Sequence, residues 1–271
     1  LFMCMFLLSQ SDLYSQTIGE TIPKGKKWYT ITADAELGFV GVLSHKIKFG
    51  ENDTYFDYKK MGGQDYLFPV ARFSIETAFY NKHIISFLYQ PLEFNTKVRL
   101  NEDVVIDSKT FQSGKTVNLL YSFPYYRLSY LYNLSKNPLH EFSIGFGMQI
   151  RNANIIFEAD DGSTELVRNS NVGPVPLFKV RGKYGFKNGV WLGFEIDGMY
   201  APVSYLNGST RDVTGAIVDT SVKGGLTLKN NIFPYVNVRY VGGGATNEDP
   251  EDYAKNWIHL LTVTLGVKVQ L

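Results

Sequence analysis

The sequence lacks any long hydrophobic run, and this absence excludes a membrane protein made of transmembrane helices. Such a helix needs ~20 consecutive apolar residues, and no segment of the 271-residue chain approaches that length. Cysteine occurs once, as Cys4, and histidine four times. No phosphate-binding loop, dinucleotide fingerprint or zinc-ligand spacing is present. We therefore expect neither a cofactor nor a metal.

An excess of charge of one sign is also missing. The formal net charge is +1, and no basic cluster is interleaved with aromatic residues as in a nucleic-acid-binding surface. The sequence thus argues against a polyionic partner, nucleic acid included.

The last fifteen residues carry the most informative pattern that is present, a two-residue alternation. One face holds Trp257, His259, Leu261, Val263, Leu265, Val267, Val269 and Leu271. The other face is mostly polar and holds Asn256, Ile258, Leu260, Thr262, Thr264, Gly266, Lys268 and Gln270. Alternation over a membrane-spanning length is typical of the last strand of an outer-membrane barrel, apolar toward lipid and polar toward the lumen.

The composition fits a membrane barrel. Aromatic residues make up 15% of the chain, yet the mean hydropathy is only −0.12. Because half of every barrel strand faces a polar lumen, a membrane barrel looks unremarkable on a hydropathy average. The length suits a single barrel.

The same alternation predicts ten strands, at about 28–44, 66–80, 83–95, 117–134, 139–157, 172–186, 189–203, 211–228, 231–243 and 256–271. Tight polar turns at 81–82, 135–138, 187–188 and 229–230 alternate with longer connections at 45–65, 96–116, 158–171, 204–210 and 244–255. Short periplasmic turns and long extracellular loops are typical of membrane barrels. We therefore predict an all-β fold, a closed transmembrane antiparallel barrel of ten strands.

The proposed outward rows contain no charged residue. They include Ala35, Leu37, Phe39, Phe73, Ile75, Phe87, Phe146, Phe178, Phe194, Val222 and Val238. The inward rows hold Asp34, Glu36, Arg72, Glu76, Arg127, Arg151, Lys179, Arg181, Lys183, Glu195, Asp197, Asp219, Lys223, Arg239 and Lys268. A Lys or Arg facing lipid at the midplane costs about 2–4 kcal/mol, so this sorting indicates lipid outside and a charged lumen inside.

A soluble sandwich or lipocalin-like barrel is the main alternative fold. Such folds bury their apolar rows. Here, however, aromatic residues gather at both ends of the outward rows, with Tyr132 and Tyr184 near the turns and Tyr200, Tyr240 and Trp257 near the loops. Two such bands are expected at the two membrane interfaces, so we favour the membrane barrel.

The N-terminus fits export. Residues 1–8 (LFMCMFLL) form an apolar core, and the following SQSDLYSQ resembles the end of a signal peptide, with cleavage near Ser15 or Gln16. The basic first part of a signal peptide is missing, as in a segment truncated at its start. We expect a signal peptide over 1–16 and the barrel over 17–271; a buried strand or a lipoprotein anchor at Cys4 is the alternative for the first segment.

Six short stretches carry a resemblance to a known family: residues 88–93 (LYQPLE), 125–132 (YYRLSYLY), 151–155 (RNANI), 173–177 (GPVPL), 242–245 (GGGA) and 256–259 (NWIH). Together they resemble an uncharacterised family of Gram-negative outer-membrane β-barrel proteins. The resemblance spans most of the chain after the signal segment. It implies a barrel in the bacterial outer membrane, and it brings no assigned activity and no catalytic residues.

The candidate lumen-lining residues are Glu76, Arg127, Arg151, Lys179, Arg181, Glu195, Asp197, Asp219 and Arg239. Two interpretations stay open: a plug of mutually satisfied charges, or a narrow, anion-preferring path or binding site lined by the basic members. We expect the four arginines to point inward and to find Glu76, Glu195, Asp197 or Asp219 as partners. The reason is that an unpaired charge in a narrow bore is costly.

Catalytic groupings are scarce. Some lipid A deacylases use a lipid-facing histidine with a serine two residues later, but the residue two positions after His259 is Leu261. Ten strands also resemble the omptin proteases, which use acidic pairs and a histidine at the outer mouth. The loop at 247–252 (NEDPED) offers carboxylates for such a role or for a divalent cation; a solvated acidic loop is the simpler interpretation.

We therefore expect a porin-like, non-enzymatic protein of the outer membrane that binds or slowly passes small polar solutes through a charged lumen. The alternative is an outer-leaflet enzyme that acts on lipid A or peptides at the extracellular rim. The expected partners are outer-membrane lipid, lipopolysaccharide and, through the C-terminal strand, the barrel-assembly machinery.

Overall fold

The computed structural model describes residues 28–161, 166–202, 213–228, 231–249 and 253–271. The expected signal peptide at 1–16, the loop at 204–210 and the turn at 229–230 lie outside these residues. In the described part of the chain no helix is long and apolar enough to cross a membrane.

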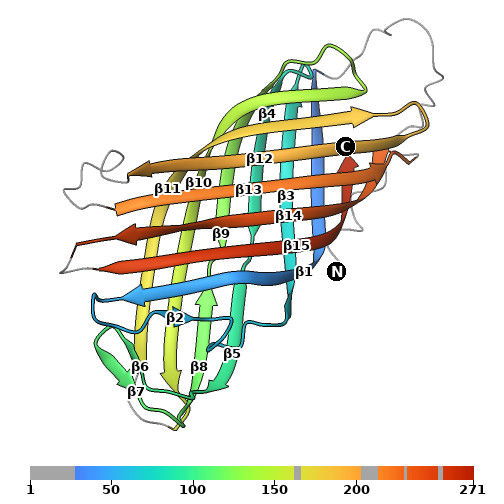
Figure 1. Cartoon of the computed structure of the whole chain (residues 1–271). Coiled ribbons are helices and arrows are strands. Elements are labelled where there is room, and N and C mark those ends of the chain that lie inside the picture. Colours follow the sequence, from blue (N-terminus) through green and yellow to red (C-terminus); the bar gives the residue numbers. More distant parts are fainter. Residues whose placement is uncertain (1–27, 162–165, 203–212, 229–230, 250–252) are drawn as a thin grey trace, which may run out of the picture.

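Ten strands of the described residues form a closed antiparallel barrel (Figure 1), as the alternation predicts. They are β1 (Tyr29–Phe49), β3 (Leu67–Phe79), β4 (His83–Gln90), β9 (Tyr125–Asn133), β10 (His140–Ala159), β11 (Leu166–Gly185), β12 (Val190–Pro202), β13 (Val213–Leu226), β14 (Ile232–Asn247) and β15 (Ala254–Gln270). Each strand pairs with the next in this order, and β15 pairs with β1 to close the circle. Closure leaves no unpaired barrel edge.

The two ends of the barrel differ, as the connection lengths predict. At one end lie the tight turns; the β3–β4 turn has Tyr80 and Asn81 in the left-handed region, with φ of 51° and 55°, as two-residue hairpins require. The first strand begins and the last strand finishes at this same end, where Thr32 pairs with Gln270. It is the periplasmic end, because outer-membrane barrels place their short turns there.

The exterior of the barrel is apolar. Leu37 of β1, Phe178 of β11 and Leu265 of β15 are 62%, 79% and 70% exposed. The other large exposed hydrophobic residues of the barrel strands follow the same outward rows, among them Phe73, Ile75, Phe87, Phe146, Ile150, Phe194, Val222 and Val238. An exposed apolar band of this extent is stable only against lipid.

Two predicted strands are interrupted at prolines. Strand 83–95 divides at Pro91 into β4 and β5 (Glu93–Arg99), and strand 117–134 divides at Pro124 into β8 (Thr116–Ser122) and β9. The two breaks lie side by side, because β4 pairs with β9 below them and β5 pairs with β8 above them. A proline gives no N–H to the ladder, so the sheet bends here and β5 and β8 continue beyond the barrel.

The prediction of loops at 45–65 and 96–116 is wrong in part, because these segments contain β-strands. β1 continues to Phe49, and β2 (Phe56–Asp57), β5, β6 (Val104–Ile106), β7 (Lys109–Phe111) and β8 follow. Figure 1 shows β2, β6 and β7 gathered at one end of the barrel, away from the end where β15 finishes. These segments form an ordered extracellular cap.

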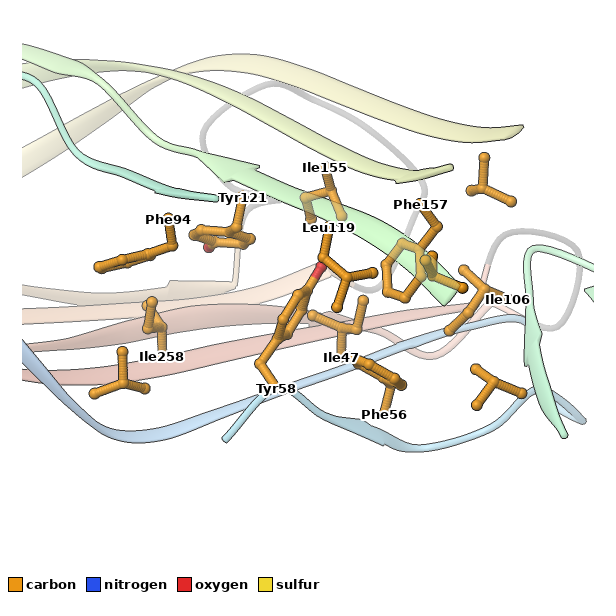
Figure 2. Packing of buried hydrophobic residues seen from close by; sticks show 14 of the residues in the cluster. Ile47, Phe56, Tyr58, Phe94, Ile106, Leu119, Tyr121, Ile155, Phe157 and Ile258 are labelled. Carbon is orange, nitrogen blue, oxygen red and sulfur yellow. The ribbon is translucent and has the colours of Figure 1, made fainter. Parts of the chain in front are cut away.

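The cap closes over an apolar cluster, so the expectation of a polar lumen fails in the outer half of the barrel. Figure 2 shows Ile47, Phe56 and Tyr58 on one wall facing Leu119, Tyr121 and Phe157 on the other. The ring centroids of Phe56 and Phe157 lie 5.0 Å apart, edge to face. Each such buried side chain contributes about 1.5–3 kcal/mol, which makes the cap a small hydrophobic core.

Polar side chains also lie inside this core. The Nδ1 atom of His45 is 2.8 Å from the Oε1 atom of Gln64, and its ring stacks on Tyr58 with centroids 4.2 Å apart. Burial, and secondarily the neighbouring Tyr121, raises the pKa of the Tyr58 phenol well above its ordinary value. The Tyr58 phenol is therefore neutral at physiological pH, as an apolar core requires.

Candidate functional site in the barrel interior

Below the apolar cluster, charged side chains fill the middle of the bore. Arg127 of β9 is 1% exposed; its Nη1 atom donates to Asp197 of β12, and its Nη2 atom lies 3.0 Å from Asp219 of β13. Arg239 of β14 donates to the same Asp219 at 2.7 Å. Arg127 lies on a different wall from Asp197 and Asp219, so its side chain crosses the bore rather than lies flat against the wall.

A second group is centred on Glu195 of β12. Lys179 of β11 donates to Glu195 and to Asp197, while Lys223 of β13 lies 3.5 Å from the other oxygen of Glu195. Arg72 of β3 reaches Glu195 from the far side of the barrel at 3.5 Å. Three bases therefore share one carboxylate, which stabilises a buried negative charge that would otherwise be costly.

Glu36 of β1 extends this network toward β14. It accepts hydrogen bonds from Tyr235 Oη at 3.0 Å, from Asn237 Nδ2 at 2.7 Å and from Thr264 Oγ1 at 2.8 Å. Arg72 lies 3.5 Å from it. The polar middle of the bore is thus a connected set of charges and hydrogen bonds, which resists rearrangement of any one member.

Nearer the periplasmic end, Arg181 of β11 binds two carboxylates. Its Nη1 and Nη2 atoms donate to Glu76 of β3, and its Nε atom donates to Glu141 of β10 at 2.7 Å. Arg181 and Glu76 again lie on facing walls. This second bridge crosses the bore beside Glu195, which is the register partner of Arg181 on β12.

Eight of the nine predicted lumen residues come together in these two layers: Glu76, Arg127, Lys179, Arg181, Glu195, Asp197, Asp219 and Arg239. Arg151 does not join them. It lies at the level where β9 gives way to β8, and its buried Nε atom has no hydrogen-bond partner among the described residues. The predicted carboxylate partner of Arg151 is therefore not found in the described chain.

Sequence reasoning missed several members of the site. Glu141, Tyr235, Asn237 and Gln149 were not singled out; the Oε1 atom of Gln149 accepts from Arg127 Nε at 3.0 Å. Glu36, Arg72 and Lys223 were placed in the inward rows without a role. All seven occupy inward positions of their strands, so the two-residue period could have found them. What the period cannot supply is the pairing across the bore, because facing strands are distant in the sequence.

A cavity of about 720 Å³ lies between this charged layer and the periplasmic turns. It is lined by residues 80–82 and 135–138, which belong to turns at that end, by Asn133 at the end of β9, and by Arg181, Lys183 and Trp191 farther in. The cavity therefore opens toward the periplasm. Its wall carries six lysine or arginine side chains and three carboxylates, so it is a positively charged chamber.

Lys183 of β11 lines this cavity beside two aromatic rings. Its Nζ atom lies 5.9 Å from the ring centroid of Trp191 and 5.7 Å from that of Phe233, and it forms no ion pair with a described carboxylate. The Nε1 atom of Trp191 is buried without a hydrogen-bond partner in the described chain. A cation and an unused N–H donor thus stand side by side in the cavity wall.

At its inner end the cavity meets a second, much smaller cavity of about 40 Å³. Arg72, Arg127, Glu195 and Lys223 are among the residues that line this second cavity. A space of that size holds a few water molecules. Above it stand the buried Arg127–Asp219 layer and then the apolar cluster. The bore is therefore filled from its middle to its outer end.

The outer rim offers little for catalysis. The Nδ1 atom of His259 is 2.7 Å from the phenol oxygen of Tyr240, both on outward positions of β15 and β14. The acidic loop at 247–252 lies partly outside the described residues, and within the described chain no group of three or more histidine, cysteine or carboxylate side chains could hold a metal. The rim thus shows a hydrogen-bonded His–Tyr pair.

No protein-family model matches this sequence, and no curated protein matches it either. Among solved structures, the outer membrane protease OmpT from Escherichia coli is similar, with a TM-score of 0.52 and 13% identity over 89% of this chain and 97% of that chain. The transport unit of the E. coli autotransporter AIDA-I aligns over 92% and 93% at 9% identity with a TM-score of 0.39. The Pseudomonas putida toluene transporter TodX aligns over 89% and 90% at 8% identity with a TM-score of 0.34.

The OmpT similarity is one of fold. Combined with the apolar exterior and the placement of the short turns, it decides the location. The protein is an integral β-barrel of the bacterial outer membrane. At this level of identity the similarity assigns no activity, and the interior described above is what argues for a function.

Proposed function

We propose that this protein is a non-enzymatic outer-membrane barrel whose periplasm-facing cavity binds small anionic solutes. The observation that carries the proposal is the excess of six basic over three acidic side chains in the cavity wall. A concave site with an excess of charge of one sign raises the local concentration of counter-ions.

Two features of the wall narrow the class of solute. Lys183 has no carboxylate partner in the described chain, and Trp191 has an unused N–H donor beside it. Trp191 and Phe233 also give the wall an apolar, aromatic surface next to the cation. An anion that carries an aromatic or apolar group matches both features.

The filled bore argues against a standing pore. A solute bound below Glu195 meets the Arg72–Glu195 bridge, then the Arg127–Asp219 layer, and then the apolar cluster. Passage to the outside therefore requires these layers to rearrange. We expect slow or no passage, with the cavity acting mainly as a binding site.

The proposal is tested with phenyl phosphate, titrated by calorimetry into the purified barrel in detergent. Wild-type protein should bind it, and a Lys183→Met, Lys268→Met double variant should bind at least about tenfold more weakly, because two cations leave the cavity wall. A Lys97→Met variant is the control, since Lys97 is exposed outside the cavity and pairs with Asp160. Equal affinity of the double variant and wild type would refute the proposal.

An outer-leaflet enzyme centred on His259 has weaker support, because its ring is bonded to Tyr240 and Leu261 occupies the position at which a serine would act. Mass spectrometry of lipid A from cells with and without the protein separates the two functions. We expect identical lipid A spectra. A new deacylated species that disappears in a His259→Ala variant would favour the enzyme.

A further inference from the structure

The outer surface of β1 and β15 changes character just above the apolar band. Leu43 of β1 and Leu261 of β15 are the last large apolar residues exposed on these strands toward the extracellular end. The next outward positions include Lys46, which pairs in register with Trp257. A tryptophan beside the end of an apolar row marks the level of the lipid headgroups. Because the short turns lie at the opposite, periplasmic end of the barrel, these headgroups belong to the outer leaflet.

Three lysines project from the barrel at this level. Ile47 and Phe49 are buried in the cap, so Lys46 and Lys48 between them point outward, because side chains alternate along a strand. On β15, Asn256 bonds inward to Tyr121, so Lys255 points outward as well. Lys48 and Lys255 are direct partners across the two strands.

Like charges directly opposite on neighbouring strands destabilise a sheet. None of the three lysines forms an ion pair with a carboxylate of the described chain. The carboxylate of Asp57 is the nearest in register to Lys46, but its Oδ1 atom accepts the backbone N–H groups of Lys59 and Lys60 at 3.0 and 3.2 Å. Within the described chain no ion pair relieves the repulsion in this group, and an external anion would relieve it.

Aromatic rings complete the arrangement. The Nζ atom of Lys46 lies 5.7 Å from the ring centroid of Tyr55, and that of Lys48 lies 5.4 Å from the centroid of Tyr253. The Trp257 indole N–H donates to Thr246 Oγ1 at 2.9 Å, which fixes the orientation of its ring. Rings that hold ammonium groups at headgroup level are suited to an amphiphilic ligand with an anionic head.

We propose that Lys46, Lys48 and Lys255, flanked by Tyr55, Tyr253 and Trp257, bind the phosphorylated headgroup of a glycolipid of the outer leaflet. The phosphate oxygens accept from the three ammonium groups, and the acyl chains lie along the apolar rows that end at Leu43 and Leu261. This site lies on the outside of the barrel, so it is independent of the periplasmic cavity.

The test is native mass spectrometry of the detergent-solubilised barrel with diphosphorylated lipid A, with dephosphorylated lipid A and with inorganic phosphate as a competitor. The wild-type barrel should bind diphosphorylated lipid A at least about tenfold more tightly than the dephosphorylated form. A K46Q/K48Q/K255Q variant should lose about tenfold or more in affinity. A K46R/K48R/K255R variant keeps the charges and should bind as wild type does.

A K97Q/K109Q/K187Q variant removes the same number of charges elsewhere and should bind as wild type. Equal lipid A affinity of the glutamine variant and wild type would overturn the proposal, as would equal binding of dephosphorylated lipid A. Displacement of lipid A by millimolar inorganic phosphate would also overturn it, because the site would then serve a free anion. The difference in gel migration between heated and unheated samples checks that each variant is folded. We expect all variants to fold, because surface lysines contribute little to stability.

Discussion

Arg72 and Glu195 face each other across the full width of the barrel. Arg72 is on β3 and Glu195 on β12, which lie five strands apart in either direction around the circle, yet Arg72 Nη2 is 3.5 Å from Glu195 Oε1. Two side chains that meet across the diameter leave no continuous passage at that level. The charged residues at mid-height of the bore therefore form a layer that connects the facing walls of the barrel.

Replacement of Glu195 by alanine should lower the free energy of unfolding by about 3 kcal/mol. The change removes an ion-pair partner from Arg72, Lys179 and Lys223. Breaking a buried ion pair typically costs about 3–5 kcal/mol. We expect the lower end, because each base keeps another partner, Glu36 or Asp197. Urea unfolding in phospholipid vesicles, followed by tryptophan fluorescence, measures the change.

Glu248→Ala is the matched control, since Glu248 is an exposed loop carboxylate. It should change the free energy of unfolding by less than about 0.5 kcal/mol. Equal values for the two variants would mean that the lumen charges are hydrated rather than paired, and a wide aqueous bore would then replace the filled one.

Gly266→Ala should destabilise the barrel by about 1–3 kcal/mol. A methyl group at Gly266 would lie well inside the contact distance of the Tyr235 ring. The ring would then have to move away from Asp34 and Glu36, to which its phenol donates at 2.6 and 3.0 Å. The same urea titration reports the loss.

Gly198→Ala serves as the comparison for Gly266→Ala. The nearest atom to its added methyl group is the backbone oxygen of Ile217 at 3.5 Å, an ordinary contact. This variant should be as stable as wild type. A Gly266→Ala variant that is equally stable would show that the Tyr235 ring does not need the space over Gly266.

Phe157→Ala should loosen the extracellular cap, at a cost of about 3–5 kcal/mol. The Phe157 ring is 2% exposed and packs against Phe56. The readout is cleavage of the cap by an external protease, which should become faster. Phe178→Ala on the lipid face, where the ring is 79% exposed, should leave the cleavage rate unchanged. A cap as resistant in Phe157→Ala as in wild type would contradict the apolar core.

The architecture could be predicted from the sequence because a strand repeats every two residues and lipid tolerates no charge. The ten-strand count, the tight turns and the outward rows such as Leu37 and Phe39 all follow from these two facts. The inward placement of the charged candidates follows in the same way. Arg181 and Arg239, for example, form ion pairs inside the barrel with Glu76 and Asp219.

The filled outer half was missed because it needs a different pattern. In residues 37–43 (LGFVGVL) both faces of the strand are apolar or small, and in 117–121 (VNLLY) and 153–157 (ANIIF) each face carries apolar residues. A run without alternation indicates burial on both faces, whereas the predicted outward rows take only Leu37 and Phe39 from these stretches. The cavity could not be predicted, because its wall joins turns and strands whose packing across the bore is not local in sequence.

The central claim is that the interior is open to the periplasm and closed to the outside, and thiol accessibility in cells tests it most directly. In a Cys4→Ser background, one cysteine is placed in the cavity (Ala78→Cys) or on the extracellular surface (Glu51→Cys). The probe is a sulfonated maleimide dye too large for general porins. We predict that intact cells label only Glu51→Cys and that cells with a permeabilised outer membrane label both. Labelling of Ala78→Cys in intact cells would contradict the account.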